Sequence, residues 1–416
     1  MKSSIRILLP LTALLLAGSL SAQGHDRWHQ QFRVRIWNPV ATNDIVHLDL
    51  ADITGDGEPD LLYADPSYHS GGSRFDVGRV IVLDGVSGTP VFEQVGALRG
   101  GKLGTRARFL EDLDGDGVSD IAMTARSLGD DILHLFSGAT GQRIGRELGY
   151  ADCLDIISVG DHTGDGKAEL VIARDNRATG HVLELVDGAN GSVLKRRPVT
   201  EAFYINLVRL GDLDGDGLPE IGTYRPFSTA ETPVQCEVLR GTNLRPLPMF
   251  TPEMTHATLL ADAGDVDADG IPDILVGDYL TSSGSRFYHG ELKVLSGATA
   301  AVLAHHVGLS GDRVGGLAKG LGDVNHDGHA DYLVGSKVMD RGNGHGQHLS
   351  ELRIISGIDH SKQDRFFARG NNANGDRTIA VSPATATDGP TFGVIDPKQR
   401  VFRPMITRLY LFTYGP

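Results

Sequence analysis

The sequence predicts an all-β fold, a single β-propeller, and two repeated features favour it. An Asp/Gly-rich motif occurs six times, and a short apolar run with the length of a buried strand, such as 121–123 or 274–276, follows it. A period near 50 residues is typical of propeller blades. The copies begin 49 to 60 residues apart, at Asp52, Asp112, Asp161, Asp212, Asp265 and Asp323.

The second repeat shows how four strands fit into one period. Its motif ends at Asp120, and we expect strands at 121–124, 132–136 and 143–147. A turn, 137–141, separates the last two, and similar turns recur at 84–88, 187–191 and 296–299. The run 154–158 then leads into the next motif. We therefore expect four-stranded blades with the Asp/Gly motif between the first and second strands.

The motif has the composition of a calcium loop. Every copy carries an oxygen-bearing side chain at positions 1, 3, 5 and 9 and glycine at position 6, where a turn with positive φ is needed. Calcium takes six to eight oxygen ligands. The candidate ligands at positions 1, 3, 5 and 9 are Asp52, Thr54, Asp56, Asp60; Asp112, Asp114, Asp116, Asp120; Asp161, Thr163, Asp165, Glu169; Asp212, Asp214, Asp216, Glu220; Asp265, Asp267, Asp269, Asp273; and Asp323, Asn325, Asp327, Asp331.

Position 7 has no shared side-chain chemistry, so we expect it to contribute only its backbone carbonyl. The residues there are Glu58, Val118, Lys167, Leu218, Ile271 and His329. The motif is not an EF-hand, because that loop needs a bidentate glutamate at position 12. A metal-free Asp/Gly turn is the alternative for any single copy. Six copies in one register favour up to six structural calcium ions.

The acidity of the chain is mostly that of these loops. The formal net charge is −14, which becomes −16 without Lys2 and Arg6. Six calcium ions would reduce this to about −4 and relieve the repulsion between clustered carboxylates. Such a chain lacks the basic footprint of a nucleic-acid-binding protein.

Residues 1–22 have the pattern of a cleavable signal peptide: a basic start, an apolar core and small residues near Ala22. We therefore expect a secreted or extracytoplasmic protein. No run is long and apolar enough to predict a membrane span. Residues 23–416 show no linker, so we expect one propeller domain.

The closest match to a known family is the segment 314–328, Val-Gly-Gly-Leu-Ala-Lys-Gly-Leu-Gly-Asp-Val-Asn-His-Asp-Gly. It resembles the FG-GAP repeats of the integrin α-subunit propeller, which are also described as VCBS-type repeats in secreted bacterial proteins. The "FG" element is loose elsewhere, and "GAP" survives only as 64–66. The resemblance implies a calcium-stabilised propeller that carries its ligands on the face opposite the calcium loops.

The number of blades depends on the two ends of the chain. Residues 372–376 resemble a decayed seventh motif, for which we predict no calcium. Segments 378–381, 391–394 and 408–412 read as three strands, and 32–37 as a fourth. Sharing one blade between the termini would protect both sheet edges. We expect seven blades, with six as the alternative.

Cys153 and Cys236 are the only cysteines. In an exported protein they can form a disulfide. On this architecture they are not neighbours, which favours two buried thiols.

The connection between the second and third strands is long in several repeats, and two copies share Gly-Ser-Arg-Phe, at 72–75 and 284–287. Because repeats 5, 6, 7 and 1 follow one another around a closed ring, these loops can form one patch for a glycan or a protein. Plain loop decoration is the alternative. The candidate ligand-binding residues are Tyr68, Arg74, Phe75, Tyr279, Arg286, Phe287 and Tyr288.

Two functional readings compete, and a purely structural scaffold is a third possibility. The first is a non-catalytic binding or adhesion module, which we favour because no hydrolase or zinc-protease signature occurs in the sequence. The second is a polysaccharide lyase or hydrolase on the same scaffold, since one fold hosts many chemistries. No catalytic residue is assigned.

Overall fold

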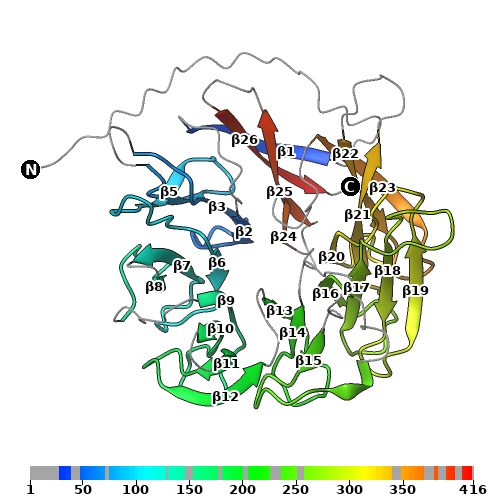
Figure 1. The fold of residues 1–416 in the computed structure, drawn as a ribbon, viewed down its shortest axis with the longest axis horizontal. Helices are drawn as coiled ribbons and strands as arrows, with labels where there is room; N and C mark the ends of the chain where they lie inside the picture. The colour runs from blue at the N-terminus through cyan, green and yellow to red at the C-terminus, as the bar shows by residue number, and fades with distance from the viewer. Residues whose placement is uncertain are drawn as a thin grey trace, which may run out of the picture.

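The structure is a computed structural model that describes residues 28–38, 47–70, 75–127, 130–145, 153–176, 180–199, 205–224, 236–250, 257–339, 348–369, 379–382, 390–398 and 405–414. The expected signal peptide, Arg74 and the decayed motif at 372–376 lie outside these ranges. The described strands form seven antiparallel sheets of three or four strands, arranged as blades around a central axis (Figure 1). No helix in these ranges is long and apolar enough to span a membrane.

The first three sheets follow the chain in order. The first contains β2 (His47–Ala51), β3 (Asp60–Asp65), β4 (Arg79–Leu83) and β5 (Pro90–Val95). The second contains β6 (Ala107–Leu110), β7 (Asp120–Ser127) and β8 (Asp130–Phe136). The third contains β9 (Cys153–Ser158), β10 (Leu170–Asn176), β11 (Gly180–Val186) and β12 (Val193–Val199).

The next three sheets continue the same order around the ring. The fourth contains β13 (Asn206–Arg209), β14 (Ile221–Tyr224) and β15 (Glu237–Leu239). The fifth contains β16 (Leu259–Gly264), β17 (Asp273–Asp278), β18 (Glu291–Leu295) and β19 (Val302–Val307). The sixth contains β20 (Leu317–Gly322), β21 (Asp331–Met339), β22 (His348–Ile355) and β23 (Lys362–Arg369).

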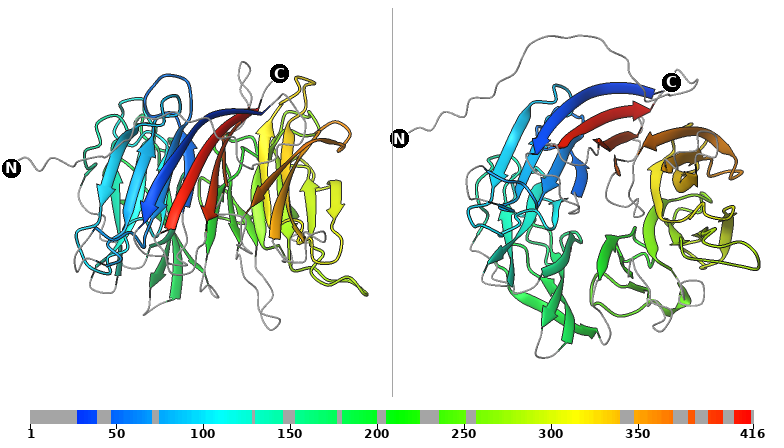
Figure 2. Two further views of the ribbon diagram at one scale, coloured as in Figure 1. Left: turned by 90° about the horizontal axis from the view of Figure 1, so that it is seen from above. Right: turned by 45° about the horizontal axis from the view of Figure 1, so that its top comes forward.

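The seventh sheet joins the two ends of the chain. It contains β24 (Ile379–Ser382), β25 (Thr391–Lys398), β26 (Met405–Tyr414) and the N-terminal strand β1 (Trp28–Asn38). β1 pairs antiparallel with β26 from Trp28↔Tyr414 to Asn38↔Met405. Figure 2 shows these two strands side by side, spanning the ring between the first and sixth sheets. The pairing covers an edge of β26 that would otherwise be unpaired.

The core lies between neighbouring blades, because successive side chains of a strand point to opposite faces of its sheet. On β10, Leu170 and Ile172 pack toward the second blade, while Val171 and Ala173 pack toward the fourth. On β17, Leu275 packs on the sixth blade and Ile274 on the fourth. These strands are apolar on both faces, which explains the continuous apolar runs after each motif.

The first strand of each blade lies nearest the axis (Figure 1). First strands of neighbouring blades contact one another, as β2 does with β6, β9 with β13 and β16 with β20. Six side chains on these strands alternate in charge around the axis, and we call them the channel ring. Arg108 lies 3.0 Å from Asp155, and Lys319 interacts electrostatically with Asp49 and Asp262. In chain order the ring is Asp49, Arg108, Asp155, Arg209, Asp262 and Lys319.

The two cysteines are buried thiols in different inter-blade clusters. The Sγ of Cys236 lies 2.8 Å from the carbonyl oxygen of Ala257. A disulfide, which the sequence left open, is therefore absent from this structure.

Candidate metal centre

Each Asp/Gly motif lies between the first and second strands of its blade, as expected, and is organised around the aspartate at position 1. In the second loop, Asp112 accepts hydrogen bonds from the backbone N–H of Gly115 at 2.6 Å and of Gly117 at 2.7 Å. The position-6 glycines all have φ near +90°. Position 4 also has positive φ, which the motif did not reveal, because Ala268 and His326 stand there in two copies.

The acid at position 9 is buried at the start of the second strand, where one oxygen closes the loop. One carboxylate oxygen of Asp273 accepts from the N–H of Val266, position 2, at 2.7 Å. Its other oxygen accepts from the N–H of Gly297 at 2.9 Å. The same second bond joins Asp60 to Gly85, Asp120 to Gly138 and Asp331 to Gly357.

These glycines belong to the turn that recurs after the third strand, so the two repeated motifs form one structure. A Cβ atom on Gly297 would lie 1.9 Å from the carbonyl oxygen of Pro272, position 8 of the loop. The corresponding glycine of every other loop-bearing blade meets the position-8 carbonyl at 1.9 to 2.4 Å. Sequence reasoning noted the turn but did not connect it with the Asp/Gly loop. The turn glycine follows position 9 by 18 to 26 residues, so no fixed spacing in the sequence connects the two motifs.

Positions 7 and 8 contact the loop of the preceding blade. The ring nitrogen Nδ1 of His329 lies 2.8 Å from the carbonyl oxygen of Val266, and the N–H of Ala330 donates to the carbonyl of Asp265 at 2.8 Å. Ala168 donates to Asp112 in the same way, at 3.0 Å. Position 7 was expected to act only through its carbonyl, so this side-chain contact is an addition to that expectation.

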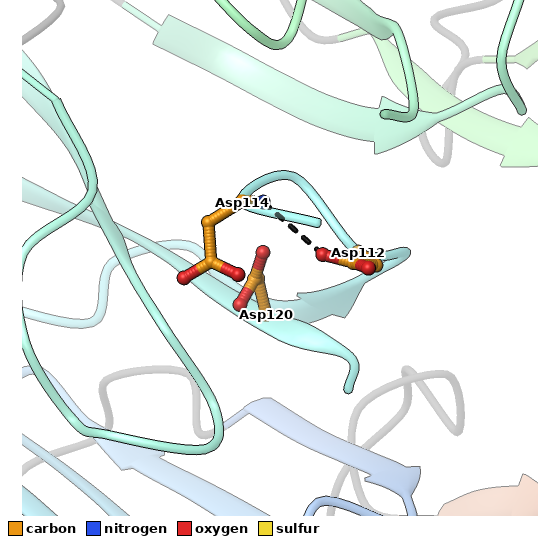
Figure 3. Close-up of side chains that lie close together, drawn as sticks. All are labelled: Asp112, Asp114 and Asp120. Carbon is orange, nitrogen blue, oxygen red and sulfur yellow. Dashed lines mark hydrogen bonds between the residues drawn. The ribbon is translucent and has the colours of Figure 1, made fainter. Parts of the chain in front are cut away.

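The carboxylates converge in four of the six loops, where the oxygen atoms of three acids lie within 4.8 Å of one another. Figure 3 shows Asp112, Asp114 and Asp120 pointing toward a common point. The other three groups are Asp161, Asp165 and Glu169; Asp212, Asp214 and Glu220; and Asp265, Asp267 and Asp269.

Three buried carboxylate oxygens in these groups have no hydrogen-bond partner, namely Oδ1 of Asp114, Oδ2 of Asp214 and Oε1 of Glu220. Of these, Oδ2 of Asp214 has a protein cation beside it. A buried unpaired carboxylate oxygen is costly, and a bound cation would satisfy it. Oxygen donors are also what calcium prefers. The residues present therefore fit a hard divalent cation.

The electrostatics of the loops favour a cation as well. Burial, together with repulsion from acids of the same loop, raises the pKa of Asp120, Asp273 and Asp331 to about 6. The same causes raise the pKa of Glu220 to about 7. A nearby cation would oppose these shifts by favouring the charged form.

The fourth loop differs from the others because it already has a protein cation beside it. The guanidinium of Arg240 lies 2.7 Å from Oδ2 of Asp214. Other blades have Asp or Ser at this place in the turn. This residue was not anticipated from sequence.

The proposed ligand-face residues do not form one patch. The first and fifth blades lie on opposite sides of the ring (Figure 1). Tyr68 is half-buried beneath Arg79, whose guanidinium carbon lies 4.0 Å from the ring centroid, and Tyr279 is half-buried. Of the candidate ligand-binding residues, the exposed ones are Phe75, Arg286, Phe287 and Tyr288.

Comparison with known proteins supports the fold. No family model matches the chain, and no curated protein matches it. Among solved structures, BBS1N in complex with ARL6DN is similar. The two share 11% sequence identity with a TM-score of 0.53, and the match covers 93% of this chain and 97% of that chain. The Dos1 propeller is less similar, with 10% identity, a TM-score of 0.48 and a match over 86% of this chain and 76% of that chain. The exotype rhamnogalacturonan lyase YesX has 14% identity, a TM-score of 0.44 and a match over 90% of this chain and 75% of that chain.

The chain is therefore an all-β propeller. Its identity with these structures is too low to transfer a function.

Proposed function

We propose that the chain is an exported calcium-binding propeller of the FG-GAP type, and that it acts as a non-catalytic binding module. Calcium is held by the acids at positions 1, 3, 5 and 9 and by the carbonyl at position 7. The buried, unpaired oxygens of Asp114 and Glu220 are the observation that carries this proposal. The resemblance of 314–328 to FG-GAP repeats supports it.

The role of the metal is structural. Each loop connects two strands of a blade. In four loops the position-9 acid binds the turn after the third strand, and Ala168 and Ala330, at position 8, donate to the loop of the preceding blade. A cation that neutralises the loop therefore stabilises both the blade and its neighbour. Because binding is restricted to the folded state, it stabilises that state by mass action.

The ligand is a glycan or an extracellular protein, bound on the face opposite the calcium loops. Exposed aromatic side chains on that face support this part of the proposal, since large exposed apolar groups mark interaction sites.

Two measurements test the proposal. Metal analysis of the mature chain after dialysis against calcium should find several bound ions, and a chelator should lower the melting temperature. Immobilised neutral and acidic glycans, offered in calcium, should retain the protein without releasing product. An unchanged melting temperature with no bound metal would refute the calcium site, and released product would replace the binding module with an enzyme.

A further inference from the structure

Two surface structures, one in the first blade and one in the fifth, are copies of each other. Each consists of the end of the loop between the second and third strands, packed on the segment that leads to the next blade. We call them platform 1 (75–78 with 96–104) and platform 5 (287–290 with 308–315).

The backbone hydrogen bonds of the platforms correspond one to one. Gly100 donates to the carbonyl of Phe75 at 3.0 Å, as Gly311 does to Phe287 at 2.9 Å. Gly96 donates to Gly78 at 2.9 Å. The equivalent bond in platform 5 runs from Gly308 to Gly290. In the same way, the bond from Lys102 to Asp76 matches that from Arg313 to Tyr288, and the bond from Leu103 to Val77 matches that from Val314 to His289.

Both platforms also contain the same parallel bridge, Gly78↔Leu103 and Gly290↔Val314. A Cβ atom at either glycine would lie 2.2 Å from backbone atoms of its bridge partner. Phe75 and Phe287, the last residues of the two Gly-Ser-Arg-Phe segments, therefore lie in a duplicated backbone structure, which argues against plain loop decoration.

Each platform exposes an aromatic ring and a leucine. Phe75 is 43% exposed and Leu98 55%, while Phe287 is 65% exposed and Leu309 62%. Burial of such groups would be favourable in the presence of a ligand with apolar faces. The outer faces of sugar rings have this property.

Cations accompany the rings at both places. The guanidinium carbon of Arg99 lies 5.5 Å from the ring centroid of Phe75, and that of Arg313 lies 5.2 Å from Tyr288. Lys102 and Arg313 occupy the same place in the two copies, and Arg286 is exposed beside platform 5.

One acid accompanies each platform. Asp312 accepts from the N–H of Leu309 at 2.8 Å, and Asp76 lies 3.8 Å from Nδ1 of His69. Platform 1 therefore has two cations and one acid, and platform 5 has one of each with Arg286 beside it, although the whole chain has a net charge of −14.

Platform 1 also borders a cleft of about 430 Å³ between the first and second blades. Arg126, His134 and Arg143 line it together with apolar residues, and no carboxylate of the described residues does. An anionic ligand matches this lining.

We propose that platforms 1 and 5 are two equivalent sites for a glycan that carries uronic-acid carboxylates. The sugar faces pack on Phe75 and Phe287, and the carboxylates pair with the neighbouring arginines. This inference rests on the proposed binding function and specifies its ligand class and number of sites.

Equilibrium dialysis of a labelled hyaluronan hexasaccharide against the mature, calcium-loaded protein tests the proposal. Hyaluronan is a suitable probe because it contains glucuronic acid. We expect about two sites on the native chain, about one in Phe75→Ala and in Phe287→Ala, and at least tenfold weaker binding in the double variant. Ile358→Ala, which changes an equally exposed apolar residue elsewhere, should retain both sites.

Carboxyl-reduced hyaluronan separates the role of charge from that of stacking. It should bind at least tenfold more weakly than the native oligosaccharide. The variants Arg99→Gln with Lys102→Gln, and Arg286→Gln with Arg313→Gln, provide a second series if either alanine variant melts earlier than the native protein.

A single site, binding unaffected by both series, or equal binding of the reduced sugar would overturn the inference. So would retention of only neutral glycans or of a protein, a result that leaves the binding function itself intact. If the native protein bound no calcium and retained no ligand at all, the proposed function itself would be refuted.

Discussion

The turn glycine after the third strand has a role that depends on one missing atom. Gly297 donates to Asp273 and approaches the carbonyl oxygen of Pro272 so closely that a Cβ would lie 1.9 Å from it. The absence of a side chain therefore allows the turn to pack on the Asp/Gly loop. The turn glycine comes similarly close to the position-8 carbonyl oxygen in the other five loop-bearing blades.

Gly297→Ala should lower the free energy of unfolding by about 2 to 4 kcal/mol, because the turn must move away from the loop and its hydrogen bond to Asp273 is lost. Chemical unfolding in calcium measures this. Gly316→Ala is the matched control, since its Cβ would be in ordinary contact with Tyr279 at 3.4 Å. Equal stability of the two variants would contradict the role given to the turn.

Glu220 is expected to have opposite effects with and without calcium. Its Oε1 is buried and unpaired, and burial and neighbouring acids raise its pKa to about 7. Glu220→Gln removes a repelling charge, so the chelated protein should be more stable by about 1 kcal/mol. In calcium the variant should be less stable than the native chain, because a ligand is lost.

Thermal unfolding of Glu220→Gln, with and without chelator, tests this reversal. Glu237→Gln, which removes a surface partner of Arg197 at 2.9 Å, should show the same small effect in both conditions. If Glu220→Gln raised the melting temperature in both conditions, or lowered it in both, Glu220 would not be a metal ligand.

At the scale of the element, the loop, its two strands and the following turn act as one unit. The loop brings several carboxylates together, and burial raises the pKa of the position-9 acids Asp60, Asp120, Glu220, Asp273 and Asp331. The unit is therefore sensitive to both protons and metal.

The stability of the metal-free protein should rise as the pH falls from about 7.5 to about 5. The folded-state pKa of Asp120, Asp273 and Asp331 is about 6, above the ordinary value of 3.8, so the folded chain takes up protons before the unfolded chain does. With calcium the trend should reverse, because protons compete with the ion. Melting temperatures across this pH range, with calcium or chelator, should converge near pH 5; parallel curves would contradict the shared site.

At the scale of the molecule, the blades are held in order by inter-blade cores, by contacts between successive loops and by the channel ring. In the channel ring, Lys319 interacts with Asp49 and Asp262, whose pKa values are raised by burial and lowered again by neighbouring cations. Charges from blades that are distant in sequence thus meet near the axis.

Lys319→Met should destabilise the protein more at pH 7.5 than at pH 5. Without the cation, the folded-state pKa of Asp49 and Asp262 rises further, so stability is lost above that pKa and recovered as the acids take up protons. Urea unfolding at the two pH values measures the difference. Lys195→Met, on the exposed strand β12, should show no such pH dependence.

The fold class was predictable because it is written in local, repeated patterns. Apolar runs such as 170–173 and 274–276 identify middle strands that are buried on both faces, and the positive φ of the position-6 glycines follows from the motif itself. The candidate calcium ligands could likewise be predicted from spacing, since those of any one loop lie within a nine-residue segment.

Only the tertiary structure decided how distant segments meet. The pairing of β1 with β26, the packing of each turn on its Asp/Gly loop, and the ion pair between Arg240 and Asp214 join residues that no local pattern connects. The Gly-Ser-Arg-Phe copies were visible in the sequence, but their separation across the ring was not. Local spacing determines the conformation of a loop, whereas contacts between blades depend on the order and closure of the whole ring.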